Sequence, residues 1–285
     1  METHHFTFGA LTPGLAYIMS CAGSLLGLLC TTRAQVLTGR PRIQWLMAGA
    51  LAIGGTGIWV MHFIGMLGFS AAFTVIRYDI PLTLFSAVIA IAAAGVGLYI
   101  AGAHGASGGR LLLGGLLTGL GVAGMHYTGM AAMNMNAAIS YDPALVMASI
   151  VIAIVAATAA LWAAVHLRNM RATVGAALIM GVAVSAMHYT GMFAMHVEGL
   201  EASAVPSGAQ PRAFLVPIIL GLSISTMCLL TALGVAPTPQ EMQREARLME
   251  QLARRNASRS LRPNAAYPPP RHQAPPPLRR QNPHP

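Results

Sequence analysis

Charged residues are scarce in this sequence. They make up 9% of the 285 residues, no lysine is present, and 55% of the residues are hydrophobic, with a mean hydropathy of +0.61. A soluble domain carries about 25% charged residues. The deficit excludes an ordinary water-facing surface, so we expect the bulk of the chain to lie in a lipid bilayer.

Cysteine and catalytic polar residues are scarce as well. The three cysteines, Cys21, Cys30 and Cys228, fall inside apolar runs and show no CxxC spacing. This pattern excludes the disulfide framework of a secreted domain and a cysteine-based metal site, and it predicts small buried side chains. The polar residues supply no acid–base pair or activated nucleophile in a soluble domain, so we expect the chain not to be an enzyme.

Long apolar runs, in contrast, are frequent. A helix needs about 20 apolar residues to cross a bilayer core of about 30 Å. The runs do not alternate as barrel strands do, so they predict helices. The first run follows "METHHFTFGALTPG", which has no positive region, and is interpreted as a retained helix rather than a signal peptide. The sequence predicts an all-α polytopic membrane bundle with seven transmembrane helices, approximately Leu11–Thr31, Ile43–Gly68, Ile80–Gly102, Leu111–Met133, Ala144–Val165, Thr173–Met195 and Ala213–Val235.

The placement of arginine indicates how these helices are oriented. Alternate loops are basic, and the C-terminal tail is the most basic segment of all. The positive-inside rule therefore places the N-terminus, residues 1–10, outside and the tail in the cytoplasm. The arginines of the first, third and fifth loops are Arg33, Arg40, Arg42, Arg110, Arg168 and Arg171.

One short motif occurs three times. Met-His-Tyr-Thr-Gly-Met runs from Met125 to Met130 and again from Met187 to Met192, and the stretch from Met61 to Met66 reads "MHFIGM". The spacing between copies leaves room for two membrane crossings, so each copy returns to the same membrane face. The membrane domain, residues 11–235, is therefore predicted to contain three repeated helical hairpins, at about 43–102, 111–166 and 173–235, after one extra N-terminal helix.

The motif places histidine and methionine on one helical face. Residues four apart share a face, so each motif histidine lines up with the motif's last methionine. Imidazole and thioether together suit copper, and the glycines between them allow close approach. Possible additional ligands are Met133, Met195 and His196, and acids that could orient the rings or guide cations are Asp79, Asp142 and Glu198.

Other interpretations of the motif remain open. A histidine near a helix end can reach the headgroups, and methionine is a flexible core filler, so the repeat could be a packing hairpin that was duplicated. Haem held between histidines of neighbouring helices is an alternative cofactor. Copper transport or a copper chaperone is a third reading, although transport sites generally lie near the bilayer midplane.

The chain resembles the MHYT domain family, bacterial integral membrane sensor domains named after this motif. The resemblance covers about Leu11 to Val235, and two copies match MHYTGM in full. It implies a sensory role in the bacterial inner (plasma) membrane, with copper at the outer face and oxygen, carbon monoxide, nitric oxide or redox state as the signal. The copper ligands that it implies are Met61, His62, Met66, Met125, His126, Met130, Met187, His188 and Met192.

The C-terminal tail, residues 236–285, differs sharply from the membrane domain. Gln240–Leu261 is predicted to form an amphipathic helix whose arginines suit an anionic leaflet, and the proline-rich stretch from Pro263 is predicted to be disordered. Many relatives carry a fused cyclic-di-GMP enzyme, histidine kinase or DNA-binding regulator, whereas this sequence predicts a standalone form. Signalling would then pass through the tail to a separate cytoplasmic protein. The tail has one aromatic residue, Tyr267, and no regular interleaving of aromatic residues with its arginines, so we expect no nucleic-acid binding.

Overall fold

The computed structural model describes residues 3–4, 7–71, 75–102, 107–198, 206–235 and 239–260. The chain divides into two units, Met1–Ala236 and Pro237–Pro285. In the second unit the structure describes one helix, α9 (Pro239–Ser260), over the segment in which the sequence predicts an amphipathic helix. The proline-rich stretch predicted to be disordered lies outside the described residues.

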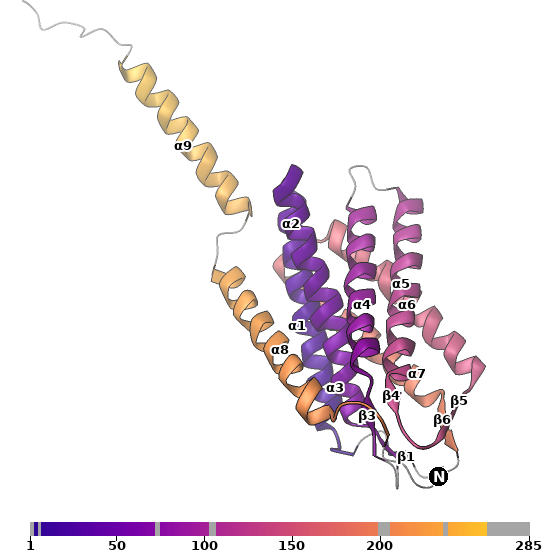
Figure 1. Cartoon of the computed structure of the whole chain (residues 1–285). Coiled ribbons are helices and arrows are strands. Elements are labelled where there is room, and N and C mark those ends of the chain that lie inside the picture. Colours follow the sequence, from indigo (N-terminus) through magenta and orange to yellow (C-terminus); the bar gives the residue numbers. More distant parts are fainter. Residues whose placement is uncertain are drawn as a thin grey trace, which may run out of the picture. The chain divides into compact units, whose positions relative to one another are not determined.

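Seven of the described helical spans are long and apolar enough to cross a membrane, which confirms the predicted membrane bundle (Figure 1). The second span is one continuous rod made of α2, a π-helical segment η1, and α3. The bounds in the first unit are α1 Leu11–Ala34, α2 Gly39–Ala50, η1 Leu51–Val60, α3 Met61–Leu67, α4 Ile80–Ala101, α5 Gly108–Ala131, α6 Pro143–His166, α7 Met170–Phe193 and α8 Pro211–Val235.

The outer surfaces of these helices are apolar. Large side chains such as Phe85 on α4, Leu112 on α5, Val155 on α6 and Ile179 on α7 are exposed. Contiguous apolar surface of this kind is rare on soluble monomers. In a bilayer the same surface contacts lipid tails, while the helices satisfy their own backbone hydrogen bonds.

Aspartates start two of the outer helices. Asp79 precedes α4, and its Oδ1 accepts a hydrogen bond from the Leu82 N–H at 2.8 Å. Asp142 precedes α6, and its Oδ1 accepts from the Ala144 N–H at 2.7 Å. Each helix has proline in its first turn, where no N–H is needed. Tyr78-Asp79 and Tyr141-Asp142 occur at matching places in the first two hairpins, and each pair therefore marks a helix start.

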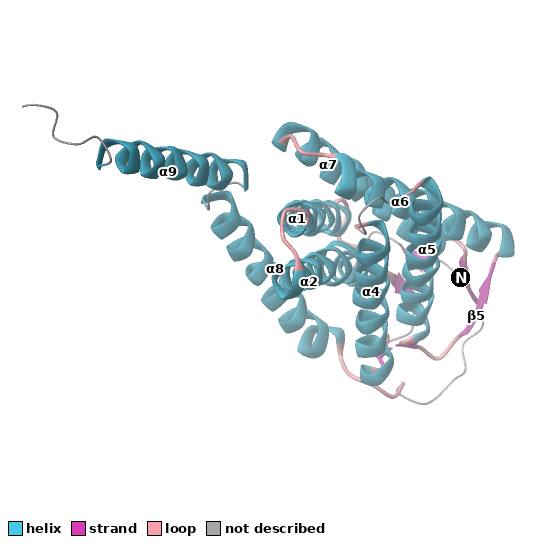
Figure 2. Ribbon diagram, turned by 90° about the horizontal axis from the view of Figure 1, so that it is seen from above, coloured by secondary structure: helices cyan, strands magenta, loops and turns pink. Residues whose placement is uncertain are grey.

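Six helical rods form a ring. α4 packs between η1 and α5, α6 packs between α5 and α7, and α1 packs between α7 and the η1–α3 rod. The motif helices α3, α5 and α7 thus alternate with the outer helices α4, α6 and α1. The order along the chain agrees with three hairpins after an extra first helix. In space, however, α1 takes the third outer position, and α8 packs outside on α1, η1 and α3 (Figure 2).

Short antiparallel strands repeat this three-fold arrangement at one end of the ring. In each pair, the strand before an outer helix meets the strand that follows a motif helix. The pairs are β1 (Thr3–His4) with β2 (Ser70–Ala71), β3 (Arg77–Tyr78) with β4 (Met133–Asn134), and β5 (Ala138–Tyr141) with β6 (Met195–Glu198).

Backbone hydrogen bonds confirm that α1 is the equivalent of α4 and α6. The N–H groups of Asp79 and Asp142 donate to the carbonyl oxygens of Ala132 and Ala194, both at 2.8 Å. Ahead of α1, the Thr7 N–H donates to the Gly68 carbonyl oxygen at 2.9 Å. Each of the three acceptors follows its motif histidine by six residues, so one contact occurs three times.

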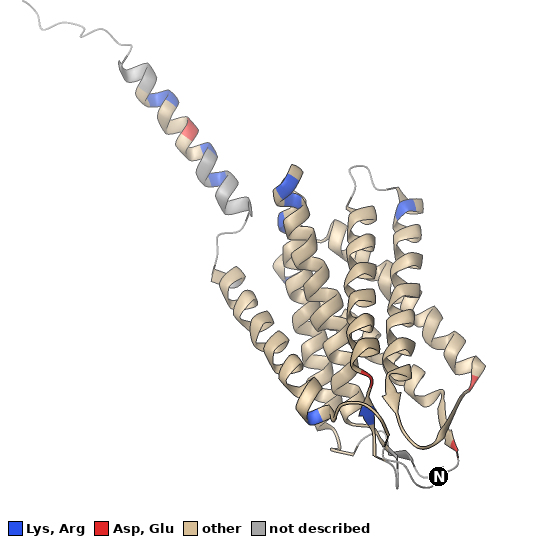
Figure 3. Ribbon diagram, viewed as in Figure 1, with Lys and Arg blue, Asp and Glu red and all other residues tan. Residues whose placement is uncertain are grey.

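Charge is distributed unevenly between the two ends of the ring. The arginines at the end of α1 and the starts of α2 and α5 lie together at one end, which we call the arginine end, and the acidic residues before α4 and α6 lie at the other (Figure 3). This second end also carries Arg77 in β3 and Arg212 at the start of α8. The end with the acidic residues is also the end of the strands, and the C-terminal turns of α3, α5 and α7 reach it. The three motif copies therefore lie nearer this end than the arginine end.

Candidate metal centre

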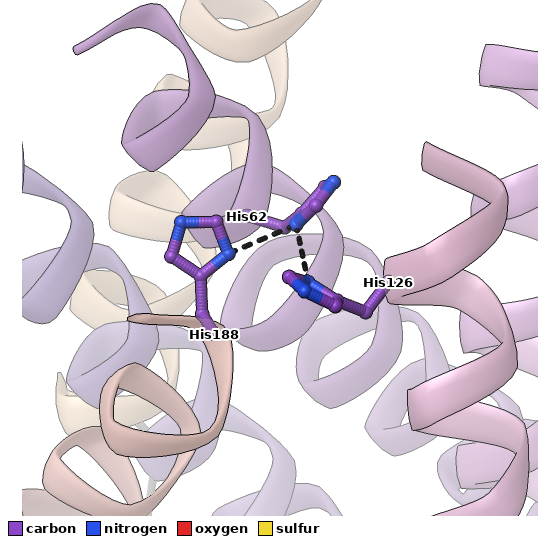
Figure 4. A group of neighbouring side chains, drawn as sticks. All are labelled: His62, His126 and His188. Carbon is purple, nitrogen blue, oxygen red and sulfur yellow. Dashed lines mark hydrogen bonds between the residues drawn. The ribbon is translucent and has the colours of Figure 1, made fainter. Parts of the chain in front are cut away.

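Three histidines meet at the centre of the ring. His62 comes from α3, His126 from α5 and His188 from α7, and they are the histidines of the three motif copies (Figure 4). Their exposed fractions are 1%, 0% and 0%. Each can offer a ring nitrogen such that the three nitrogens lie within 4.8 Å of one another. We call this cluster the His triad.

The Nδ1 atoms of the triad converge. The Nδ1 of His62 lies 3.0 Å from that of His188 and 3.1 Å from that of His126. A neutral ring nitrogen carries either one hydrogen or one lone pair in the ring plane. The Nδ1 of His62 therefore has one direction available for two neighbours, and it can make a full hydrogen bond with only one of them. With all three Nδ1 atoms deprotonated, their lone pairs would form a donor set for a metal ion.

Each ring of the triad packs against the glycine of another motif copy. A Cβ added to Gly129 would lie 2.5 Å from the Nε2 of His62. Because only glycine leaves this space, the ring occupies the position of a missing side chain. Gly191 accommodates His126 and Gly65 accommodates His188 in the same way. The copies interlock in a cycle, and no copy forms its part of the site alone.

The motif methionines are buried in the core that surrounds this level of the ring. None of the six is more than 2% exposed, and all belong to one apolar cluster: Met61, Met66, Met125, Met130, Met187 and Met192. Met133 and Met195 are also buried, but α5 ends at Ala131 and α7 at Phe193. These two methionines lie in β4 and β6, so they do not extend the helical face of the histidines.

The other residues singled out in the sequence lie away from the triad. His196 is exposed on β6, where it pairs with Ser140, and Glu198 is exposed on the same strand. Asp79 and Asp142 accept hydrogen bonds from the backbone of their own helices. The Nε2 atoms of His62 and His126 have no hydrogen-bond partner among the described residues. A role for these acids in orienting the rings therefore stays a prediction.

Aromatic rings support the triad on the side of the first copy. Phe63 packs edge-on against His62, with ring centroids 4.8 Å apart, and also contacts Trp59 and Tyr78. The Trp59 indole donates to the Ser86 hydroxyl at 3.0 Å, and burial raises the pKa of the Tyr78 phenol. Motif comparison missed Trp59. The sequence feature that could have identified it is a tryptophan in the middle of an apolar run, because a buried indole needs a hydrogen-bond acceptor nearby.

Comparison with known proteins identifies the repeat. Residues 55–115, 119–177 and 181–243 match the MHYT family, which is described as a bacterial signalling protein N-terminal repeat. Each matched segment contains one motif copy and therefore one histidine of the triad. No solved structure matches the chain.

Three bacterial proteins are similar to this chain over part of their own length. The bifunctional diguanylate cyclase/cyclic di-GMP phosphodiesterase MucR of Pseudomonas aeruginosa is 41% identical over 66% of this chain and 28% of its own length. The cyclic di-GMP phosphodiesterase NbdA of the same species is 34% identical over 86% of this chain and 31% of its own length. The signalling protein YkoW of Bacillus subtilis is 32% identical over 67% and 24%. The chain thus spans less than a third of each relative.

Proposed function

This chain belongs to the MHYT family of bacterial signalling proteins, and we propose that its His triad binds a copper ion through which the membrane unit senses its signal. Family membership supports a role in membrane signalling. The convergence of three Nδ1 atoms is the observation that carries the metal proposal. Imidazole binds copper in either oxidation state, and the thioethers buried in the same core favour Cu(I).

The other cofactor reading receives no support. The ring centroids of the triad lie 4.8 to 5.2 Å apart, so the imidazoles contact one another edge to face. Haem would need a slot for its macrocycle between two of these rings. A copper transporter would need a path for the ion, whereas the rings are closed in by glycine backbone of the neighbouring helices.

Copper at the triad would supply a Lewis acid that binds oxygen, carbon monoxide or nitric oxide. The chain's own part is to hold three nitrogens in place and to exclude water. The glycine contacts fix the rings, because each Nε2 edge abuts the backbone of another motif helix. Full burial keeps water from the ring nitrogens. A change of ligand or oxidation state would therefore move three helices that share one ion.

Metal analysis of a triple variant tests the copper site. We expect His62→Ala, His126→Ala and His188→Ala together to abolish bound copper while the chain stays folded and inserted. The matched control is His166→Ala, because His166 is exposed and its Nδ1 contacts the carbonyl oxygen of Trp162 in its own helix. His196→Ala separates the triad from the further ligand predicted by sequence. Wild-type copper content in the triple variant would overturn the proposal.

We also propose that the strand end of the ring faces the outside. The motivation is the arginine distribution, since Arg33, Arg42 and Arg110 belong to the opposite end. Cysteine labelling at introduced sites beside Asp142 and beside Arg168 tests it with an impermeant reagent. If the Asp142 site were labelled only from inside, the proposed orientation would be wrong.

The output is proposed to pass through α8 to the tail and a separate cytoplasmic protein, with no catalysis by this chain. α8 packs on the rod that carries His62, and the Thr226 and Thr56 hydroxyls are hydrogen bonded at 2.7 Å. Movement of that rod would be transmitted to α8. Truncation after Ala236 should preserve copper binding and remove the cellular response. A full response without the tail would exclude this route.

A further inference from the structure

A cavity of about 50 Å³ lies inside the helix ring, about one helical turn from the His triad, none of whose histidines lines it. Its lining includes Ile58, Val122 and Val184, and each of these residues precedes a motif histidine by four positions, or one helical turn. Met187, the residue before His188, lines it as well. All three motif helices therefore contribute to the cavity wall in the turn before the histidine, on the side of the triad that faces the arginine end.

The π-helical segment η1 adapts the first copy to this cavity. In α5 and α7 the lining residues of successive turns are four apart, namely Thr118 and Val122, and Met180 and Val184. In η1 they are Ile53 and Ile58, five apart, as the wider turn of a π-helix requires. π-helical turns occur frequently at functional sites. Here the extra residue lets Gly54 pack against the α4 backbone while Ile53 reaches the cavity.

The cavity wall is almost entirely apolar. α6 contributes a row of alanines, and the hydroxyl residues among the lining are Ser24 and Thr118. The Thr118 hydroxyl is already engaged, because it donates to the Ala93 carbonyl oxygen at 3.2 Å. A buried water needs two to four polar partners, whereas apolar cavities stay dry and bind apolar guests such as xenon. The wall thus favours a small uncharged guest over water.

The seam between α6 and α7 offers a route from the lipid. Ala156 and Ala160 of α6 and Ala183 of α7 line the cavity, yet all three are only half-buried. Small side chains at these positions leave a thin wall between the cavity and the outer surface of the helices. Apolar gases are more concentrated in the hydrocarbon core of a bilayer than in water. This wall therefore faces the phase that contains more of the gas.

We propose that this cavity holds a small apolar gas molecule taken from the bilayer and presents it to the triad from the side of Ile58, Val122 and Val184. Occupancy of the cavity depends only on its size and wall. Its effect on the triad rests on the proposed copper site, where the guest would become a ligand of the ion. The chain would in this way sense gas dissolved in the membrane rather than in water.

Xenon is the probe for occupancy, because it binds apolar cavities without any metal. ¹²⁹Xe NMR of the full chain in lipid nanodiscs should show a protein-bound resonance separate from xenon in lipid. Ala157→Leu fills the cavity, since Ala157 is buried and lines it. The control is Ala159→Leu, the same change at an exposed position on the same helix. We expect loss of the resonance in the first variant and its retention in the second.

Three results would overturn the proposal: no bound resonance in the wild type, its retention in Ala157→Leu, or its loss in Ala159→Leu. Ala153→Leu also fills the cavity and replaces Ala157→Leu in the test if that variant does not fold. The wild-type spectrum alone shows whether xenon occupies the cavity. Delivery is tested on copper-loaded protein by the rate of carbon monoxide association, which Ala157→Leu should slow. An unchanged rate contradicts delivery. If the chain bound xenon but no copper, the occupancy of the cavity would be confirmed and the copper proposal would be wrong.

Discussion

α1 and α8 are the two membrane helices that fall outside the repeating pattern, and they take different places. α1 precedes the three hairpins along the sequence, and α8 lies outside the ring in space. Of the most apolar stretch of each span, 56% is buried in α1 and 17% in α8. α1 fills the third outer position between α7 and the first motif rod, whereas α8 packs on the outside of the ring. α8 is the more apolar of the two, with a mean hydropathy of 2.3 against 1.6 for α1. Hydropathy therefore does not decide which helix completes the site, whereas close backbone contact does.

The largest effect is expected from breaking the contact between α1 and η1. A Cβ on Gly23 would lie 2.6 Å from the Ala52 carbonyl oxygen and closer still to the backbone of Gly57. Gly23→Ala should destabilise the fold by about 1–3 kcal/mol or more, the range found for overpacked cores. Thermal unfolding of the full chain in detergent measures this loss.

The matched control for that change lies on α8. A Cβ on Gly221 meets nothing within 4 Å. Gly221→Ala should leave stability unchanged or raise it by up to about 1 kcal/mol, because alanine favours a helix. Equal losses in the two variants would mean that α1 and α8 contribute alike, against the arrangement described above.

The second largest effect concerns metal rather than fold. Gly129→Ala places a methyl group where the His62 ring lies, so we expect copper affinity to fall about 10- to 100-fold, as when residues that orient metal ligands are changed. Gly124→Ala on the same helix has open space around it and should bind copper normally. Competition with a Cu(I) chelator gives both affinities. A Gly129→Ala chain with unchanged affinity would show that the interlock does not position the ring.

The smallest effect is expected where α8 meets the ring. Thr226→Val removes the buried hydrogen bond to Thr56 and should cost about 0.6 kcal/mol, the average for such bonds between membrane helices. Thr231→Val is the control, because the Thr231 hydroxyl donates to Met227 within α8 itself. Thermal unfolding of both variants gives the difference. A loss as large as that of Gly23→Ala would assign α8 to the core of the fold.

Periodic features of the sequence predicted the spans and the level of the motif, because apolar length and residue spacing act locally. Packing partners depend on contacts between distant segments, and hydropathy carries no information about them. A finer pattern did point to α1: Ser20, Gly23, Ser24 and Gly27 place small residues on one face, as closely packed membrane helices do. α8 has no comparable stripe, and its Gly221 is exposed.

In the candidate site, too, local features could be predicted from the sequence, whereas the packing between motif copies could not. The spacing of His62, His126 and His188 placed them at one depth, and the glycines indicated close approach. The interlock of each ring with the glycine of another copy follows from the cyclic arrangement, which no single motif specifies. Met133 and Met195 were assigned to helical faces because apolar sequence continues beyond Ala131 and Phe193, although strand pairing ends the helices there.

The cyclic interlock also constrains when the site can exist during synthesis. α1 leaves the ribosome first, but one of its two ring neighbours, α7, is among the last membrane helices to be made. Until α7 is inserted, His62 lacks the ring that faces its Nδ1 at 3.0 Å, and Gly65 has no ring to accommodate. A chain released early would hold two histidines beside an open seam. Under the copper proposal, the full ligand set therefore exists only in a nearly finished protein, and a product truncated before α7 would lack the His188 ring.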